Sequence, residues 1–246
     1  MKIMTRAAAF ATICLSLWTV EPARADMPCA TPDDLALRHI SLPIARLAIE
    51  HDKTLVVLTL GGAHTAGEDM DSRSATYPAL LETSLAAALS PAIVTVVNGA
   101  VSNATALDIP PKLPGLIEKT GARLVIWAPG GRDVALRLDP EEFRAAVAAG
   151  IAAARRAGAD LILLDTTFVP SPTRMALIGP YRDRLRQAAA DSRIPFLARH
   201  DMMLRWSKDG TLNLQAREPA EQVQVARQLF ACVAQSLAVP IAAALR

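Results

Sequence analysis

Residues that could contact a ligand are concentrated in three short stretches of the chain. They are Gly62, His64 and Thr65 in the first, Asn98, Ser102 and Asn103 in the second, and Arg132 and Asp133 in the third. The guanidinium of Arg132 offers a planar fork of N–H donors, which matches a carboxylate, phosphate or sulfate group. Asparagine and serine side chains can add hydrogen bonds to the same ligand. The three stretches therefore predict a pocket for a small molecule, with an anion as one candidate.

Structural roles compete with this interpretation at each position. Arg132 could form an internal ion pair with Asp133 or with Asp69, and such a pair would fill the pocket. Asparagine and serine side chains more commonly satisfy the backbone of their own loops. The pattern of residues alone leaves both alternatives open.

Other polar clusters are interpreted as structural or solvated. His64 with Glu68, Asp69 and Asp71 combines residue types that bind metals, but all lie on one loop without a second histidine at ligand spacing. We therefore expect a solvated acidic loop, no metal and no cofactor. Asp165, Thr166 and Thr167 follow an apolar run and could line the far side of the cleft, but a capping role is the favoured interpretation. Arg182, Arg184 and Arg186 are interpreted as an exposed helix face.

Apolar runs alternate with helical patterns along the chain, and they predict the elements that must position the three stretches. The expected strands cover residues 54–60, 93–97, 124–127, 161–164 and 195–197. The expected helices cover residues 77–89, 113–120, 140–157, 181–190 and 221–237. Short apolar strands separated by helices are typical of βαβ units and a parallel sheet. We therefore predict a three-layer α/β/α sandwich with a doubly wound, mostly parallel five-stranded sheet.

Each of the three stretches follows one of the first three expected strands. Ligands of open α/β sheets bind at the carboxyl ends of the strands, so the stretches should meet at one edge. The first stretch, Gly61–Gly67, is not a Walker A loop, because no Lys-Ser/Thr pair follows its second glycine. It is not a dinucleotide-binding fingerprint either, because its glycines fall at the first, second and seventh positions.

In order, the three stretches resemble the sequence blocks of the SGNH (GDSL-type) ester hydrolases. Gly61-Gly62-Ala63-His64-Thr65-Ala66-Gly67 is similar to the family's Gly-Asp-Ser-x-Thr-x-Gly block. The segment from Val97 to Thr105 is similar to its Asn-x-Gly block, and Gly130-Gly131-Arg132-Asp133 to its Gly-x-Asn-Asp block. The resemblance implies an ester hydrolase fold whose reaction uses a serine nucleophile, a C-terminal Asp-x-x-His pair and an oxyanion hole.

The residues that this resemblance places at the catalytic positions are unsuited to the reaction. They are Ala63 for the serine, Ala100 for the glycine, Arg132 for the asparagine, and Glu221 and Gln224 for the Asp-x-x-His pair. An alternative alignment uses Asp209–Leu212 for that pair and gives leucine at the histidine position. A serine hydroxyl needs a positioned base, and an alanine has no nucleophilic atom. The catalytic residues are therefore unknown.

Residues 1–25 have the pattern of a secretory signal peptide. A basic start and an apolar run over residues 7–20 precede Ala23-Arg24-Ala25, which has small residues at the cleavage positions. The apolar run is shorter than the roughly 20 residues that cross a membrane, and we expect no later membrane span. These features predict a secreted or periplasmic protein. The expected parts are a signal peptide (1–25), a lead-in segment (26–52) that could pack on the outside, and a single domain (53–246).

Two cysteines, Cys29 and Cys232, remain once Cys14 is removed with the signal peptide. Two cysteines in an oxidising compartment predict one disulfide, which would join the start of the mature chain to the last helix. Two buried free thiols are the alternative.

The composition excludes some partners. Lys and Arg total 26 against 24 Asp and Glu, and aromatic residues make up only 4%, so neither a basic patch nor a stacking platform for nucleic acid is expected. Three function classes stay open. The first is a non-hydrolytic binding or accessory protein with a small anionic, acyl or glycan ligand. The second is an ester hydrolase that uses unusual groups such as His64, and the third is an interaction protein with a closed cleft; no protein partner is predicted.

Overall fold

The computed structural model describes residues 29–68, 70 and 72–246. The expected signal peptide lies outside the described residues, as do Asp69 and Asp71.

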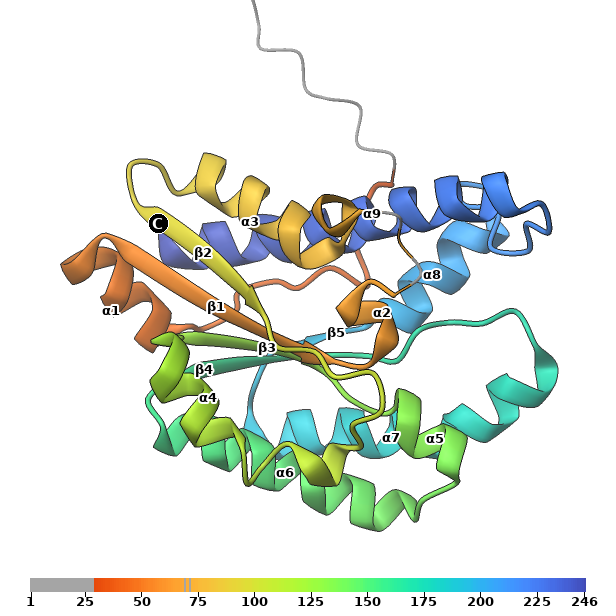
Figure 1. Cartoon of the computed structure of the whole chain (residues 1–246), viewed down its shortest axis with the longest axis horizontal. Helices are drawn as coiled ribbons and strands as arrows, with labels where there is room; N and C mark the ends of the chain where they lie inside the picture. Colours follow the sequence, from red (N-terminus) through yellow and green to blue (C-terminus); the bar gives the residue numbers. More distant parts are fainter. Residues whose placement is uncertain (1–28, 69, 71) are drawn as a thin grey trace, which may run out of the picture.

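A parallel sheet forms the middle of the molecule (Figure 1). Its strands are β1 (Thr54–Gly61), β2 (Ile93–Asn98), β3 (Leu124–Ala128), β4 (Asp160–Leu164) and β5 (Phe196–Leu197). They lie in the order β2-β1-β3-β4-β5, and every neighbouring pair is parallel. The predicted fold class is confirmed. The strand order reverses between β1 and β3, which is the point where ligands bind in sheets of this order.

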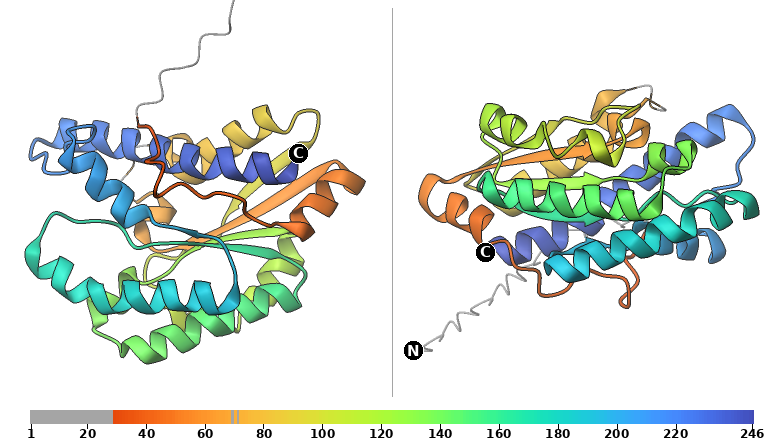
Figure 2. Two further views of the ribbon diagram at one scale, coloured as in Figure 1. Left: turned by 180° about the vertical axis from the view of Figure 1, so that it is seen from behind. Right: turned by 90° about the horizontal axis from the view of Figure 1, so that it is seen from below.

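Helices cover both faces of the sheet (Figures 1 and 2). One layer contains α1 (Pro43–Asp52), α3 (Tyr77–Ala88), α8 (Arg199–Lys208) and α9 (Pro219–Leu245). The other contains α4 (Leu113–Thr120), α5 (Gly131–Leu136), α6 (Pro140–Arg156) and α7 (Pro172–Ser192). Short helices lie in the connections that follow β1 and β2: α2 (Ala63–Ala66), η1 (Arg73–Ala75) and η2 (Ala106–Asp108).

Alternating side chains of β3 explain why both faces need a helical layer. Leu124 and Ile126 belong to the core beneath α3 and α9, whereas Val125 and Trp127 belong to the core beneath α6 and α7. Successive side chains of a strand point to opposite faces, so a continuous apolar run is what a doubly covered strand requires. Gly150 lets α6 approach the sheet closely, because a Cβ there would lie 2.4 Å from the ring of Trp127.

Two helices are longer than the predicted ranges 181–190 and 221–237, and each contains an internal proline. α7 begins at Pro172 and contains Pro180, and α9 continues through Pro240 to Leu245. A proline inside a helix removes one backbone hydrogen bond and normally ends or kinks it. In α9 the residues beyond the proline, including Ile241 and Leu245, are buried. Tertiary packing therefore stabilises this part of the helix against the local preference.

The second half of the expected lead-in segment is a helix, α1, that packs beside the sheet. Its N-cap position, Leu42, provides no side-chain hydrogen bond. The carboxylate of Asp160 in β4 takes that role, accepting the N–H groups of Ile44 at 2.8 Å and Ala45 at 2.9 Å. The capping residue comes more than a hundred positions later in the chain, so local sequence could not predict this helix.

The C-terminal helix α9 packs against α3 and is joined to the start of the described chain. A disulfide links Cys29 to Cys232 in α9, with the two Cα atoms 5.5 Å apart, as the cysteine count predicted. By length and composition α9 could cross a membrane, with a mean hydropathy of 1.7 in its most apolar window, which the sequence analysis did not expect. However, 61% of that window is buried inside the protein, which is the pattern of a core helix.

Candidate functional site

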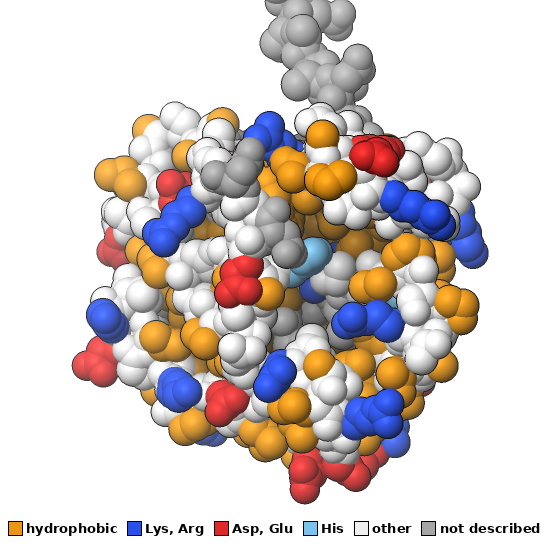
Figure 3. Space-filling model, turned by 45° about the vertical axis from the view of Figure 1, so that its right-hand side comes forward, with side chains coloured by type: hydrophobic (Ala, Val, Ile, Leu, Met, Phe, Trp, Pro, Cys, Tyr) orange, Lys and Arg blue, Asp and Glu red, His pale blue; other side chains and the backbone are white. Residues whose placement is uncertain are grey.

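A cavity of about 350 Å³ lies at the carboxyl ends of β1, β3 and β4. Figure 3 shows this face hollowed near its middle, with a pale-blue histidine side chain and blue basic side chains at the hollow. The polar side chains in the described part of its wall are His64, Thr65, Ser102, Asn103, Arg132, Thr166, Thr167, Arg174, Arg199 and His200. Six of the predicted site residues line it: Gly62, His64, Thr65, Ser102, Asn103 and Arg132. Asn98 and Asp133 are not among its lining residues.

The connection after β1 places Ala63 in the wall of the cavity. β1 ends at Gly61, and α2 starts at Ala63 with Gly62 as its N-cap residue. A Cβ on Gly61 would lie 2.3 Å from the Oγ1 atom of Thr65, so no side chain fits there. Gly67 ends the helix with a φ of 78°, which glycine adopts without a steric penalty. The glycines thus permit a tight strand-to-helix turn that brings the methyl group of Ala63 to the cavity, at the residue where the sequence resemblance expects a serine.

Asn98 joins the second stretch to the first and does not line the cavity. The side-chain Nδ2 of Asn98 donates to the carbonyl oxygen of Thr65 at 2.9 Å. Its Oδ1 accepts the backbone N–H of Ala100 at 3.1 Å, so the donor expected for an oxyanion hole is already engaged. Ser102 lines the cavity, and its hydroxyl donates to the carboxylate of Glu68.

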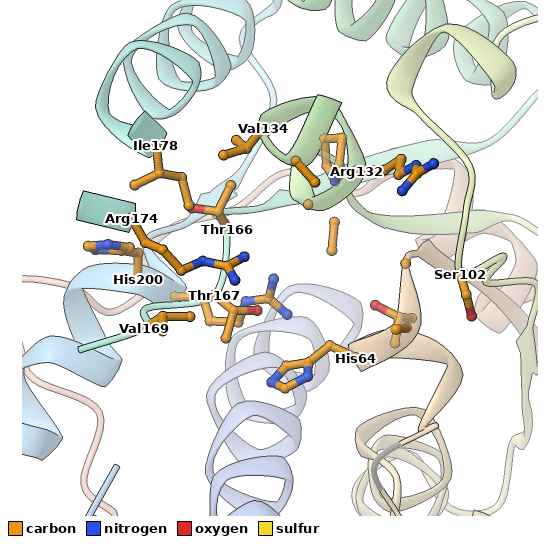
Figure 4. A pocket seen from close by; sticks show the side chains of 18 of the residues that line it. His64, Ser102, Arg132, Val134, Thr166, Thr167, Val169, Arg174, Ile178 and His200 are labelled. Atoms are coloured by element: carbon orange, nitrogen blue, oxygen red, sulfur yellow. The ribbon is translucent and has the colours of Figure 1, made fainter. Parts of the chain in front are cut away.

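The two polar residues of the third stretch have different environments, because Arg132 lies at the cavity and Asp133 lies in the protein interior. Arg132 lines the cavity, and Figure 4 shows its guanidinium directed outward on the side of Ser102. Asp133 is buried and accepts the backbone N–H of Ala106 at 2.9 Å. Burial raises the pKa of Asp133, although hydrogen bonds from backbone N–H groups oppose the increase. Within the described residues no ion pair joins Arg132 to Asp133, and Asp69 lies outside them.

Neither alignment of the Asp-x-x-His pair brings a base to the cavity. Glu221 and Gln224 are exposed on the first turns of α9, and neither lines the cavity. In the alternative alignment, Asp209 is exposed and accepts hydrogen bonds from Thr211, while Leu212 is buried. The histidines at the cavity are instead His64 and His200, which enter it from α2 and α8.

The fold is similar to that of several solved esterases. The chain matches the psychrotrophic esterase EstA from Pseudoalteromonas sp. (TM-score 0.56, 15% identity, covering 73% of this chain and 97% of that chain). It also matches the acetyl-xylooligosaccharide esterase Axe2 from Geobacillus Stearmophilus (TM-score 0.58, 17% identity, 74% and 92% covered). A third match is a protein described as lipolytic and of the G-D-S-L family, from Desulfitobacterium hafniense DCB-2 (TM-score 0.55, 17% identity, 74% and 99% covered). At these identities the likeness supports the fold alone.

Sequence similarity decides the family. The model of the Non-GDSL lipase-like family matches residues 28–246. The chain belongs to this family. The expected resemblance to SGNH/GDSL-type hydrolases is thereby confirmed, together with its α/β fold. No protein among curated sequences matches the chain.

Five polar residues that line the cavity of this Non-GDSL lipase-like protein were not among the predicted site residues: Thr166, Thr167, Arg174, Arg199 and His200. The threonines follow the carboxyl end of β4, and Arg199 and His200 follow that of β5. The rule that ligands bind at these strand ends could have found them. The predicted site residues came only from the loops after the first three strands, and a place for Thr166 and Thr167 at the cleft was the less favoured alternative to capping.

Two interpretations made from sequence are corrected by a buried ion network. Asp165 is fully buried, and its carboxylate accepts from the guanidinium of Arg182 at 2.7 Å and from the N–H of Thr166 at 2.8 Å. Arg182 also binds Asp201 at 2.7 Å, and only 12% of its side chain is exposed. Arg182 is therefore a buried link between β4 and α8 rather than part of a solvated helix face. Asp165 does bind the next N–H, but the ion pair is its main contact.

His200 lies at the cavity in an environment that disfavours its charged form. It is 3% exposed and packs edge-on against Phe168, with ring centroids 5.3 Å apart. Burial lowers the pKa of His200 and the charge of Arg182 lowers it further, although Asp165 and Asp201 oppose this. Its folded-state pKa is therefore below its unfolded value, and the neutral ring is favoured.

Replacing His200 by glutamine is expected to reduce the acid sensitivity of the fold. A histidine with a lowered pKa contributes stability above its unfolded pKa, and this contribution is lost as the pH falls through its folded pKa. Thermal unfolding at pH 7.5 and 5.5 should therefore show a smaller loss of Tm in His200→Gln than in the wild type. His51→Gln, at an exposed histidine of α1, is the control and should retain the wild-type loss. An unchanged loss in His200→Gln would contradict this assignment.

The described residues contain no group of three or more His, Cys, Asp or Glu side chains that could hold a metal ion. Two of the acidic residues considered for a metal, Asp69 and Asp71, lie outside the described residues.

Proposed function

We propose that this member of the Non-GDSL lipase-like family is an exported binding or accessory protein that does not hydrolyse esters. The cavity at the carboxyl edge of the sheet serves as its ligand site. The observation that carries the proposal is Ala63 at the turn between β1 and α2, where the family resemblance expects the nucleophile. Loss of a member of a serine catalytic triad lowers kcat by roughly 10⁴–10⁶-fold.

The surroundings of Ala63 support the same proposal. The N–H of Ala100 already donates to Asn98, and Glu221 and Gln224 do not line the cavity. A serine introduced at residue 63 would therefore lack both the family's base and one of its oxyanion donors.

Export is supported by the N-terminal sequence pattern and by the disulfide. Residues 1–25 have the signal-peptide pattern, and Cys29 is joined to Cys232. Disulfides persist in oxidising compartments, which fits a secreted or periplasmic protein.

A second candidate function is an ester hydrolase that uses His64 as base or nucleophile. His64 lies one residue after Ala63 and lines the cavity, and Figure 4 shows its imidazole on the side of the cavity near Thr167. Histidine can act as a general base near neutral pH when a group to activate lies within hydrogen-bond distance.

The expected result is no hydrolysis of p-nitrophenyl acetate above the buffer rate, and no labelling by a fluorophosphonate probe. The Ala63→Ser variant should also remain inactive, because serine without a positioned base is a weak nucleophile. The measurements are the initial rate of nitrophenolate release and the mass of the probe-treated protein.

His64→Ala and His51→Ala separate the two candidates. His64 lines the cavity, whereas His51 is exposed on α1, away from the lining residues. Wild-type hydrolysis that is lost in His64→Ala and retained in His51→Ala would overturn the binding function in favour of the second candidate.

A further inference from the structure

Arg199 is a buried cation that forms no ion pair with a described carboxylate. The residue is 5% exposed and lines the cavity. Its Nε donates to the backbone carbonyl of Asp165 at 2.9 Å. Four side-chain polar atoms of the described residues are fully enclosed without a hydrogen-bond partner, and the terminal nitrogens of Arg199 are not among them. These nitrogens are therefore accessible from the cavity that Arg199 lines. Burial of an uncompensated charge is costly, and proteins normally compensate it with an opposite charge.

The carboxylates of the neighbouring ion network, Asp165 and Asp201, are already paired with other arginines. Asp165 binds Arg182 at 2.7 Å. Asp201 binds Arg182 at 2.7 Å and Arg186 at 2.6 Å. Two carboxylates and two guanidinium groups thus balance one another, which leaves the charge of Arg199 directed at the cavity.

Further donors converge on the same side of the cavity. Figure 4 shows Arg174, from the first turn of α7, with its guanidinium directed into the cavity beside Thr167. Thr167 adds a hydroxyl group to this wall, and His64 faces it from α2. The Thr166 side chain also lines the wall, but its hydroxyl donates to Asp165. Among the described residues that line the cavity none is Asp or Glu.

The rest of this wall is apolar and partly exposed. Val134 and Ile178 line the cavity from α5 and α7. Val169 and Met175 also line it, and they are 37% and 41% exposed. Apolar side chains at a cavity mouth favour a ligand with an apolar body, since binding removes their surface from water.

We infer that the cavity binds an amphiphilic organic anion, with a carboxylate or phosphate head at Arg199 and Arg174 and a short apolar body against Val134, Ile178 and Met175. The inference rests on the proposed binding function and names its ligand class. A guanidinium fork pairs with either head group, so the two head groups share one recognition chemistry.

Calorimetric titration of the exported protein with octanoate, octyl phosphate and octyl glucoside tests this inference. The three probes carry the same eight-carbon chain and differ in their head group. At least one of the anionic probes should bind at least about tenfold more tightly than the neutral probe, which is the discrimination expected for hydrogen bonds to a charged group. Inorganic phosphate is titrated alone to measure the contribution of the apolar body.

Arginine variants test which side chains hold the head group. Arg199→Met should weaken binding of the anionic probe about 10–100-fold, and the exposed Arg174→Met about tenfold. Because Arg199→Met could impair folding, Arg174→Met provides the independent test. Arg184→Met is the matched control, since Arg184 lies on α7 outside the lining residues and pairs with Glu141. It should bind the anionic probe as the wild type does.

Different contrary results would overturn different parts of the inference: the anionic head group, the apolar body or the binding function itself. Equal binding of the neutral and anionic probes, or wild-type affinity in Arg174→Met, would overturn the anionic ligand while leaving the binding function in place. Binding of inorganic phosphate as tight as that of octyl phosphate would overturn the apolar body. No binding of any probe would overturn the inference, whereas ester hydrolysis by the same protein would overturn the proposed function instead.

Discussion

Replacing Arg182 by methionine is expected to lower the free energy of unfolding by about 3–5 kcal/mol. Arg182 binds Asp165 and Asp201 at 2.7 Å, and Asp165 is fully buried. Removing the guanidinium leaves the Asp165 carboxylate with the N–H and hydroxyl of Thr166 and with Arg186, whose nearest nitrogen is 3.7 Å away. A buried carboxylate with so little compensation destabilises the folded state strongly. Urea unfolding at pH 7 measures the effect.

Arg184→Met is a matched control on the same helix. Arg184 pairs with Glu141 where both side chains are substantially exposed, at 39% and 55%. Exposed ion pairs contribute about 0–1 kcal/mol, so the control should change stability little. The double variant Arg182→Met/Asp165→Leu should regain much of the loss, because it removes both buried charges together. Similar losses in Arg182→Met and Arg184→Met would contradict the assignment of Arg182 to the protein interior.

Replacing both Cys29 and Cys232 by serine is expected to lower the free energy of unfolding by about 5 kcal/mol, the value that the chain-entropy model gives for a long closed loop. The two cysteines are 203 residues apart, so the cross-link excludes many conformations of the unfolded chain. It also joins the start of the described chain to α9, whose neighbours in the fold include α3 and α1. Urea unfolding of the exported wild type and of the double variant measures the difference.

Reduction of the disulfide provides the control for this prediction. A reductant should destabilise the wild type and leave the double variant unchanged, because the variant has no bond to break. Intact mass of the exported protein should correspond to a chain that starts at Asp26 and should increase by the mass of two hydrogens on reduction. An unchanged mass would show that the thiols are free in the exported protein.

The sequence predicted the sheet and the edge at which the cavity lies. Runs such as residues 124–127 are apolar at every position. This pattern is typical of a strand that is covered by helices on both faces. The glycines around Ala63 and the Asn98 stretch follow such runs, so their meeting at the carboxyl edge follows from parallel strands. The absence of a serine at residue 63 is also a property of the sequence alone.

The sequence predicted the wall of the cavity less completely. It identified Arg132 as the cation for a ligand, whereas the structure also places Arg174 and Arg199 at the cavity, with Arg174 on the side away from Arg132 in Figure 4. An arginine in a helical segment looks the same in sequence whether it is solvated, as Arg184 partly is, or buried, as Arg182 is. Exposure depends on which element packs above it.

Only the tertiary structure decided the features that depend on residues far apart in the chain. The cap of α1 is the carboxylate of Asp160, 115 residues after Ala45, and the buried Arg199 donates to the carbonyl oxygen of Asp165, 34 residues before it. Hydrophobic periodicity and loop motifs report local preferences, and these specify strands, turns and the glycine-rich turn that carries Ala63. The state of a buried charge depends on every group around it, and the fold brings these groups together from separate strands and helices.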